Sequence, residues 1–380
     1  MINLDTLRKK LESVDRQLLT LVKERQDLSH NIGQLKDELG LGTRDYGQET
    51  RVVNRARELA TELGITPEVA EELFLALIRS SLTVQEKQRV ASAGEGSGRQ
   101  VLVIGGAGQM GSWIVRFLAS QGYAVEIADP TGTVDGFNCV HDWQDMTLHH
   151  DVIVVAAPLA ESNRILKAIA ERRPHGLVFD IGSLKTPLRE GVNALRDAGV
   201  KVASIHPMFG PTTELLSGRH VIFVDVGSEE GMAQAREIFA PTMATLVEMD
   251  LDSHDRMIAY VLGLSHALNI IFFTALAESG EEIPRLAQMS STTFDAQLAV
   301  ARSVAEDNPY LYFEIQSLNE FGSESLDALS SALSQLLTVL KDTNEDGFYS
   351  MMKKGEQYLH GRDSNSVSYT HLTLPKTPYV

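Results

Sequence analysis

The chain has 380 residues, of which 43% are apolar and 22% charged, and its formal net charge is −17. This composition is typical of a soluble globular protein of about two or three domains. The acidic balance and the lack of a basic block argue against nucleic acid as a partner. The single cysteine, Cys139, excludes an intramolecular disulfide framework. The first ten residues are polar and do not resemble a signal peptide. Together with the single cysteine, they favour a cytoplasmic protein.

Hydrophobic periodicity divides the chain into three blocks. Residues 1–90 have the pattern of an all-α domain, and residues 91–99 form a Gly/Ser-rich segment that we expect to be a flexible linker. In residues 100–249, short β-rich runs alternate with helical patterns, which predicts parallel βαβ units of a Rossmann-type α/β domain. Residues 250–361 are helical again, and we expect a Thr/Pro-rich tail, 362–380, to be disordered or non-native.

Neither a membrane span nor a metal site is expected. The longest apolar run, residues 258–276, is interrupted by Ser265, His266 and Asn269, and we predict a buried helix of a helical domain. No group of His, Cys and carboxylate residues has the spacing of metal ligands.

The first predicted helix, residues 3–39, carries an amphipathic stripe of Leu, Val and Ile, and two cations point into it. At about 100° per residue, Arg25 and Lys36 lie within the stripe. A desolvated cation is costly unless an anion meets it, so the pair indicates an anion site; alternatively, both side chains extend past the apolar face into water. The inward faces of the next two predicted helices also carry polar residues, namely Glu49, Ser81 and Gln85. Three such helices favour a polar pocket in a helical core.

The segments LRKKLESVDRQLLTLVKERQDLSHNIGQLK, RDYGQE and SSLTVQ resemble the all-helical chorismate mutase domain over residues 3–88. The resemblance implies that chorismate is held in its compact conformer and rearranged to prephenate while charge on the breaking ether oxygen is stabilised. It implies Arg8, Arg25 and Ser81 at the carboxylates, Lys36 and Gln85 at the ether oxygen, and Asp45 and Glu49 near the hydroxyl.

Two features of this resemblance bear on activity. Arg8 lies at the edge of the stripe, and in the family the corresponding arginine serves the partner's site in an intertwined dimer. Gln48 stands where the family usually has arginine, which should weaken carboxylate binding. The block could therefore instead be a non-catalytic dimerisation or sensing module.

The sequence GAGQMG follows a predicted strand, residues 100–104, and opens a predicted helix, as a GxGxxG dinucleotide-binding turn does. Its glycines let the backbone approach a pyrophosphate, and the helix N-terminus supplies amide donors. Asp129 ends the second strand, where a carboxylate binds a ribose 2′-hydroxyl and repels a 2′-phosphate, so NAD is favoured over NADP. The predicted cofactor contacts are Gly106, Gly108, Gln109, Met110, Gly111 and Asp129.

Two polar groups of residues, 180–185 and 206–211, follow later predicted strands, and His206 among them could act as a general base. The segments GSLK, SIHPMFGP and SHDRMIAYVLGLSHAL resemble prephenate dehydrogenase, a resemblance that covers residues 100–350. It implies that His206 takes the ring hydroxyl proton while C4 delivers hydride to NAD, with decarboxylation to 4-hydroxyphenylpyruvate. It also implies that Ser183 hydrogen-bonds His206, and that Lys185 and His266 lie near the substrate.

The sequence departs from this family at Asp295, where many members carry an arginine that binds the ring carboxylate. Arg302, seven residues on and on the same helix face, could replace it, and Arg256 is another candidate. The two resemblances together imply a bifunctional enzyme of tyrosine biosynthesis that forms a homodimer. Arogenate, the amino analogue of prephenate, remains an alternative substrate.

Overall fold

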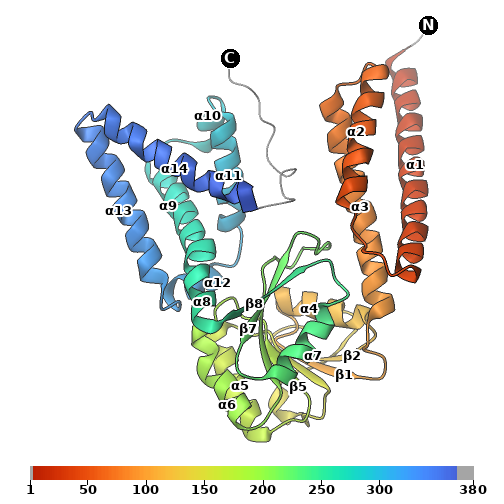
Figure 1. Cartoon of the computed structure of the whole chain (residues 1–380), viewed down its shortest axis with the longest axis vertical. Coiled ribbons are helices and arrows are strands. Elements are labelled where there is room, and N and C mark those ends of the chain that lie inside the picture. Colours follow the sequence, from red (N-terminus) through yellow and green to blue (C-terminus); the bar gives the residue numbers. More distant parts are fainter. Residues whose placement is uncertain (1–2, 366–380) are drawn as a thin grey trace.

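The computed structural model describes residues 3–365, so residues 366–380 of the expected tail lie outside the described residues. Two helical arms rise from a central α/β domain (Figure 1). One arm is N-terminal and the other C-terminal, so the expected fold class of a helical part, an α/β part and a second helical part is confirmed.

The N-terminal arm consists of α1 (Leu4–Glu38), α2 (Tyr46–Glu62) and α3 (Pro67–Ala93). The Asn3 side chain caps α1 by accepting a hydrogen bond from Thr6 N. Helix α3 packs against both α1 and α2.

The apolar stripe of α1 does not face the core of its own chain. The stripe residues are exposed, for example Leu11 at 61% and Leu28 at 63%. The face that packs on α3 instead carries Ser29 and Gly33, which are buried. A Cβ atom on Gly33 would lie 3.0 Å from Cγ of Gln85, so the missing side chain allows the close approach of the two helices.

The segment expected to be a flexible linker is packed against the central domain. Helix α3 runs three residues past the expected domain end, to Ala93. Cβ atoms on Gly94 and Gly96 would lie 2.7 Å and 2.5 Å from atoms of Gln121 and Tyr123, respectively. Gly96 N also donates to Gln121 O. These glycines therefore serve close contact rather than chain flexibility.

The central domain contains one eight-stranded sheet in the order β3-β2-β1-β4-β5-β6-β7-β8. Its strands are β1 (Gln100–Ile104), β2 (Ala124–Ala128), β3 (Asn138–Val140), β4 (Val152–Val155), β5 (Leu177–Asp180), β6 (Val202–Pro207), β7 (His220–Asp225) and β8 (Thr245–Asp250). The Rossmann-type architecture is confirmed, but β7 is antiparallel to β6, contrary to the expected all-parallel pattern. The connection between them, residues 208–219, contains no helix and so makes no crossover.

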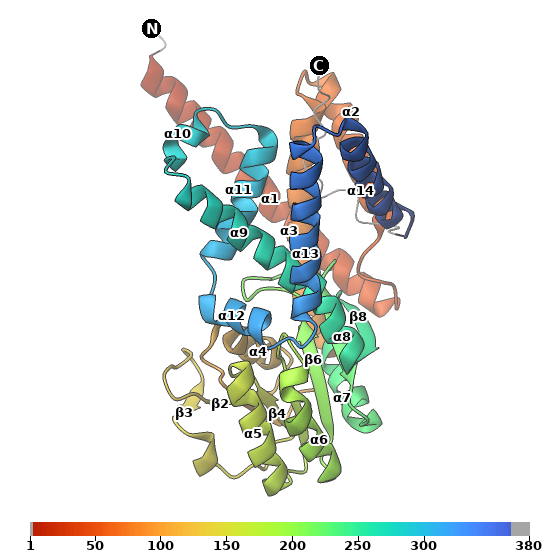
Figure 2. The ribbon, with the colours of Figure 1, turned by 90° about the vertical axis from the view of Figure 1, so that its left-hand side faces the viewer.

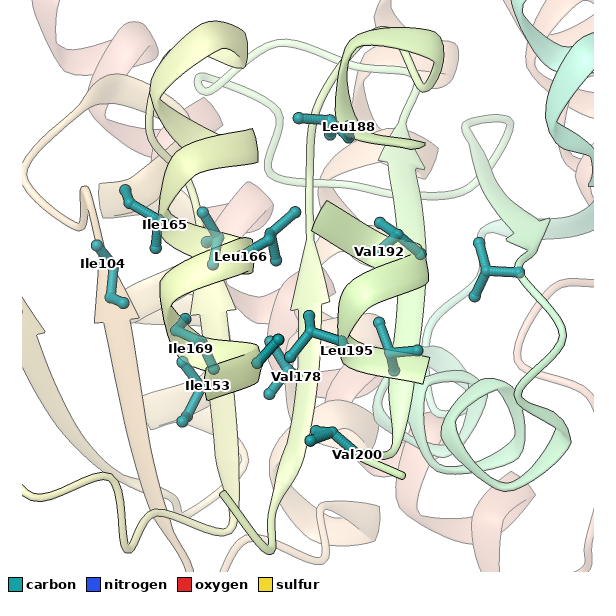
Figure 3. Close-up of a cluster of buried hydrophobic side chains, with 14 of the residues drawn as sticks. Ile104, Ile153, Ile165, Leu166, Ile169, Val178, Leu188, Val192, Leu195 and Val200 are labelled. Atoms are coloured by element: carbon teal, nitrogen blue, oxygen red, sulfur yellow. The ribbon is translucent and has the colours of Figure 1, made fainter. Parts of the chain in front are cut away.

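Helices cover both faces of the sheet. On one face, α5 (Leu159–Arg172) and α6 (Arg189–Asp197) contribute Ile165, Leu166 and Leu195 to a buried apolar cluster (Figure 3). On the other face, α4 (Gln109–Ser120) and α7 (Glu229–Phe239) supply a second cluster. This layered core fixes the strand ends at which the polar motifs lie.

The C-terminal arm rises from the central domain on the same side as the N-terminal arm and lies in front of it in Figure 2. It begins with one continuous helix made of α8 (Leu251–Ile258), a π-helical segment (Ala259–Leu264) and α9 (Ser265–Glu278). The arm continues with α10 (Ile283–Ala287), α11 (Thr292–Ala305), α12 (Pro309–Ser317), α13 (Gly322–Lys341) and α14 (Glu345–Asn365).

The apolar run 258–276, which we expect to be a buried helix, lies within the continuous helix 251–278, but only 28% of the most apolar window of that helix is buried within the chain. Among the described residues it is the one helix long and apolar enough to cross a membrane, and one such helix is weak evidence for a membrane protein. Met257, Val261, Leu268 and Ile271 are among its exposed apolar residues.

Candidate active sites

The α1–α3 interface brings together three of the predicted pocket residues. Arg25 Nη1 donates to the carbonyl oxygen of Leu77 at 2.8 Å and to Ser81 Oγ at 2.5 Å. Gln85 Nε2 donates to the carbonyl oxygen of Ser29 at 2.9 Å. Desolvation by burial lowers the pKa of the Arg25 guanidinium. A half-buried cation flanked by a hydroxyl and an amide is suited to a carboxylate ligand.

Lys36 lies further along the same face of α1, half-buried, and its Nζ donates to the carbonyl oxygen of Thr43 at 2.8 Å. Glu49 is held by a bidentate ion pair with Arg44, at 2.9 and 3.0 Å. Asp45 caps α2 by accepting from Gln48 N at 2.9 Å and is exposed. Lys36 and Glu49 thus lie at the end of the helical bundle where a loop joins α1 to α2. Asp45 is exposed at the edge of that end.

Arg8 does not join this pocket within one chain. Its side chain is 66% exposed and pairs with Asp5 at 3.7 Å. At about 1.5 Å per residue, it lies about 25 Å along α1 from Arg25. A contact between Arg8 and a ligand bound at Arg25 would require a second copy of the chain.

The glycine-rich turn between β1 and α4 is too tight for side chains. Gly105 has a φ of +80°, and a Cβ on Gly111 would lie 2.1 Å from the carbonyl oxygen of Gly105. Asp129, buried after β2, accepts a hydrogen bond from Ala107 N at 3.1 Å and from Gly132 N at 3.0 Å. The turn lies between β2 and β4 at the carboxyl ends of parallel strands, so these residues fit a dinucleotide.

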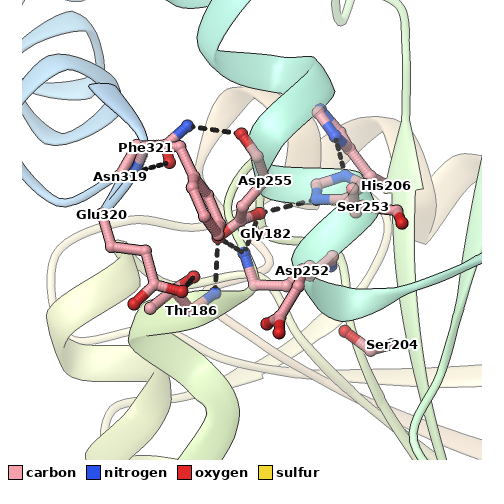
Figure 4. A network of polar contacts seen from close by, with 12 residues as sticks. Gly182, Thr186, Ser204, His206, Asp252, Ser253, Asp255, Asn319, Glu320 and Phe321 are labelled. Atoms are coloured by element: carbon pink, nitrogen blue, oxygen red, sulfur yellow. Dashed lines mark hydrogen bonds and ion pairs between the residues drawn. The ribbon is translucent and has the colours of Figure 1, made fainter. Parts of the chain in front are cut away.

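A buried chain of hydrogen bonds links His206, at the end of β6, to α8. His206 Nδ1 lies 3.0 Å from His254 Nε2, and His254 Nδ1 lies 2.6 Å from Asp255 Oδ1 (Figure 4). The Asp255 carboxylate also accepts from the backbone N–H groups of Lys185 and Thr186. Burial opposes its ionisation, but the hydrogen bonds from His254 and Thr186 prevail and lower the pKa of Asp255.

The network defines which nitrogen of each imidazole carries the proton. Ionised Asp255 can only accept, so His254 Nδ1 must donate to it. Burial lowers the pKa of His254, although Asp255 acts in the opposite direction, so His254 is neutral and its Nε2 accepts from His206 Nδ1–H. Burial, followed by His254 and Lys185, lowers the pKa of His206 well below 6.5. His206 Nε2 therefore keeps a free lone pair, as a general base needs.

Lys185, predicted near the substrate, is 1% exposed and belongs to the interior of the domain. Its Nζ donates to Asp180 Oδ1 at 2.6 Å and to the carbonyl oxygen of Ile205 at 2.8 Å. Ser204 Oγ donates to the other oxygen of Asp180. The ion pair therefore ties β5 to β6 beneath His206, a geometry that favours a structural role over direct substrate contact.

Ser183 and His266 are not joined to His206. Ser183 is half-buried on the loop after β5, and among the described residues it forms no hydrogen bond with His206. The ring of His266 on α9 lies 4.2 Å from the ring of Tyr312, and burial lowers the pKa of His266. Within the described part of the chain, the buried Nδ1 of His266 has no hydrogen-bond partner.

The two arginines proposed to replace the missing cation at Asp295 both face solvent in the single chain. Arg302 is 66% exposed, with Glu306 4.0 Å away. Arg256 is bonded to Glu324 at 3.2 Å and lies over the ring of Phe321. Arg256 also points about 200° round the helix from His254, away from the buried network.

His254 and Asp255 were not predicted from the sequence, although both lie in the quoted segment SHDRM. A His-Asp pair at the start of an apolar helix is the signal that could have identified them. Their connection to His206 depends on the packing of α8 against the β6 strand end, which periodicity does not reveal.

Comparison with known families supports this division of the chain. Residues 7–86 match the family model for chorismate mutase type II. Residues 129–248 match the nucleotide-binding domain of prephenate dehydrogenase, and residues 250–354 match its dimerization domain.

Individual relatives agree. The T-protein of Enterobacter agglomerans is 24% identical over 358 residues, which cover 93% of this chain and 92% of that protein. The crystal structure of Aquifex aeolicus prephenate dehydrogenase with hydroxyphenyl propionate and NAD+ is similar in fold, with a TM-score of 0.52, 17% identity and coverage of 70% of this chain and 98% of that one. Synechocystis arogenate dehydrogenase has a TM-score of 0.53, 17% identity and coverage of 70% and 100%.

The fold and site define a nicotinamide-dinucleotide-dependent dehydrogenase joined to a helical isomerase domain. The chain belongs to the bifunctional chorismate mutase–prephenate dehydrogenase family of tyrosine biosynthesis.

Proposed function

We propose that the helical pocket rearranges chorismate by positioning and electrostatics alone. Arg25 and Ser81 bind a carboxylate, while Lys36 and the second N–H of Gln85 stabilise charge that grows on the ether oxygen. Asp45 and Glu49 hold the hydroxyl side of the substrate. The shared contacts of Arg25, Ser81 and Gln85 at one helix interface support this proposal.

The remaining carboxylate contact comes from Arg8 of a second copy in a homodimer. Two observations support this: Arg8 lies about 25 Å from Arg25 along one helix, and the apolar stripe of α1 is exposed. The exposed apolar side chains of α9 and α13, such as Ile271 and Leu337, fit a second dimer contact in the C-terminal arm.

In the dehydrogenase site, His206 Nε2 takes the proton of the ring hydroxyl as the C4–H bond breaks. A nicotinamide dinucleotide held at the glycine-rich turn and Asp129 would supply the acceptor for that hydride. The C1–carboxylate bond then breaks, its electron pair enters the ring, and CO₂ leaves as the ring becomes aromatic. His206 returns its proton to the phenol oxygen of 4-hydroxyphenylpyruvate. The observation that carries this role is the hydrogen-bonded chain His206–His254–Asp255, because it leaves Nε2 unprotonated.

The cofactor is NAD rather than NADP. The buried carboxylate of Asp129 follows β2 beside the glycine-rich turn, where a ribose 2′-phosphate would be repelled. Comparing kcat/KM for NAD and NADP tests this preference. The variant Asp129→Ser should lower the ratio of kcat/KM for NAD to kcat/KM for NADP.

The substrate of oxidation is prephenate, and the enzyme acts in the cytoplasm. Arg302, or alternatively Arg256, supplies the cation for the ring carboxylate. Measuring kcat/KM for prephenate and arogenate side by side tests the substrate, since a preference for arogenate would show that the site recognises an amino group.

A further inference from the structure

Residues 208–219, which leave the His206 strand and return as β7, cross the nucleotide-binding helix. The ring of Phe209 lies 4.9 Å from the ring of Trp113 on α4. Trp113 Nε1 donates to the carbonyl oxygen of Thr213 at 2.9 Å. The segment therefore lies against both the strand that carries the general base and the helix that begins at the glycine-rich turn.

The far end of this segment is bound by the mutase domain. Glu86 on α3 is 3% exposed, and its carboxylate accepts from Leu216 N at 2.6 Å and from Met243 N at 2.5 Å. Leu216 belongs to the segment, and Met243 lies between α7 and β8. A buried carboxylate that accepts two backbone N–H bonds fixes both partners strongly, because loss of the carboxylate leaves two buried donors unpaired.

Arg44 adds a second link, this time to the mutase pocket itself. Its Nη1 donates to Ser217 Oγ at 2.6 Å, while its Nε and Nη2 bind Glu49. One guanidinium thus joins a predicted chorismate contact to the dehydrogenase segment. By contrast, the neighbouring pair Lys87–Glu214 is 61% and 70% exposed, and such exposed pairs contribute little.

We propose that Glu86 is a positioning residue for the dehydrogenase reaction. By holding Leu216 and Met243, the mutase domain keeps residues 208–219 in the conformation that completes the prephenate site beside His206. Arg44 and Ser217 support the same segment. This inference rests on the proposed function, since it assumes that prephenate binds beside His206.

The test is the variant Glu86→Gln in the full chain. The amide retains one acceptor oxygen but cannot accept at its nitrogen, so one buried N–H loses its partner. We expect the KM for prephenate to rise on the order of tenfold with kcat within about twofold. Mutase kcat/KM in the same polypeptide should stay within about twofold, which controls for folding. Hydrogen–deuterium exchange in peptides spanning 208–219 should accelerate.

Two further variants sharpen the test. Lys87→Ala, next to Glu86 and directed at the same segment, should change neither KM nor exchange. Ser217→Ala, which alters no mutase residue, should raise the KM for prephenate about twofold to threefold. An unchanged KM and unchanged exchange in Glu86→Gln would overturn the proposal. A parallel loss of both activities would assign Glu86 to folding and would equally overturn it.

The exchange measurement separates this proposal from the proposed function. If the wild-type chain does not oxidise prephenate, the proposed function fails. Accelerated exchange in Glu86→Gln but not in Lys87→Ala would still support the anchoring of 208–219 by Glu86, and equal exchange in the two variants would refute it.

Discussion

His206 Nδ1 lies 3.0 Å from Nε2 of His254, and this contact determines which nitrogen of His206 can accept a proton. Because His254 is held by Asp255 through its own Nδ1, it can only accept from His206. The base is thus oriented by a residue that is itself oriented by a carboxylate.

Asp255→Asn should impair catalysis by reversing this order of donors. An asparagine amide can donate to His254 Nδ1, which would move the His254 proton to Nε2 and the His206 proton to its own Nε2. We expect kcat for prephenate oxidation to fall on the order of 10²-fold or more, with mutase activity retained. Steady-state kinetics of both reactions on one preparation would check this, and an unchanged dehydrogenase kcat would refute the assigned tautomers.

His254→Asn should shift the pH dependence as well as the rate. Burial lowers the pKa of His206, and so does the positive charge that His254 carries once it is protonated at low pH, so removing His254 should raise that pKa. The acid limb of kcat/KM for prephenate should therefore move to higher pH. A pH–rate profile of the variant with an acid limb identical to that of the wild type would contradict the contact.

In the wild type, dehydrogenase kcat/KM should stay constant from neutral pH down to pH 6.5 and decline only below that value, because the pKa of His206 lies well below 6.5.

The free energy of unfolding should depend on pH in the same direction as kcat/KM. The unfolded chain binds the His206 proton near pH 6.5 and the folded chain does not, so stability is present above pH 6.5 and is lost as pH falls through the folded pKa. Urea unfolding at several pH values would measure this loss, and His206→Asn should reduce it.

Lys36→Met should strongly impair the mutase reaction and spare the dehydrogenase. Removing the cation at the ether oxygen should lower mutase kcat on the order of 10³-fold, the size seen for loss of a single electrostatic donor. Lys23→Ala, on the same helix with a side chain 70% exposed, is the matched control and should retain full activity. Chorismate consumption measured for both variants decides the role, and near-normal activity of Lys36→Met would exclude it.

Arg302→Ala should raise the KM for prephenate sharply, with the KM for NAD unchanged, because a lost carboxylate contact affects only the acid substrate. Arg256→Ala is the competing variant. If only Arg256→Ala raises the KM, the carboxylate contact belongs to Arg256, and if neither does, the cation that replaces the usual arginine at Asp295 lies elsewhere.

Local patterns were sufficient for the domain order, the glycine-rich turn and the meeting of Arg25, Ser81 and Gln85, because each depends on spacing along one or two helices or strands. They failed where a contact is decided by tertiary packing. The stripe of α1 is exposed within the chain, and periodicity alone does not say what an apolar helix face packs against. The strand β7 runs antiparallel because its connection lacks a helix.

Two buried acids illustrate the same limit. Asp255 lies 70 and 69 residues from Lys185 and Thr186, whose backbone N–H groups it accepts from. Glu86 lies 130 and 157 residues from Leu216 and Met243, which belong to another domain. A carboxylate in a sequence reveals neither its burial nor its donors. The resemblance likewise predicts that Lys185 lies near the substrate, whereas its ammonium group is bound by Asp180 within the domain.

In the proposed function, one chain carries chorismate through prephenate to 4-hydroxyphenylpyruvate. The most direct measurement is to incubate the purified protein with chorismate and NAD and to follow NADH and the product together. We predict that both appear in equal amounts, and that Lys36→Met forms them from prephenate but not from chorismate. Prephenate that accumulates without NADH, or chorismate that is not consumed by the wild type, would show that the chain does not catalyse both reactions.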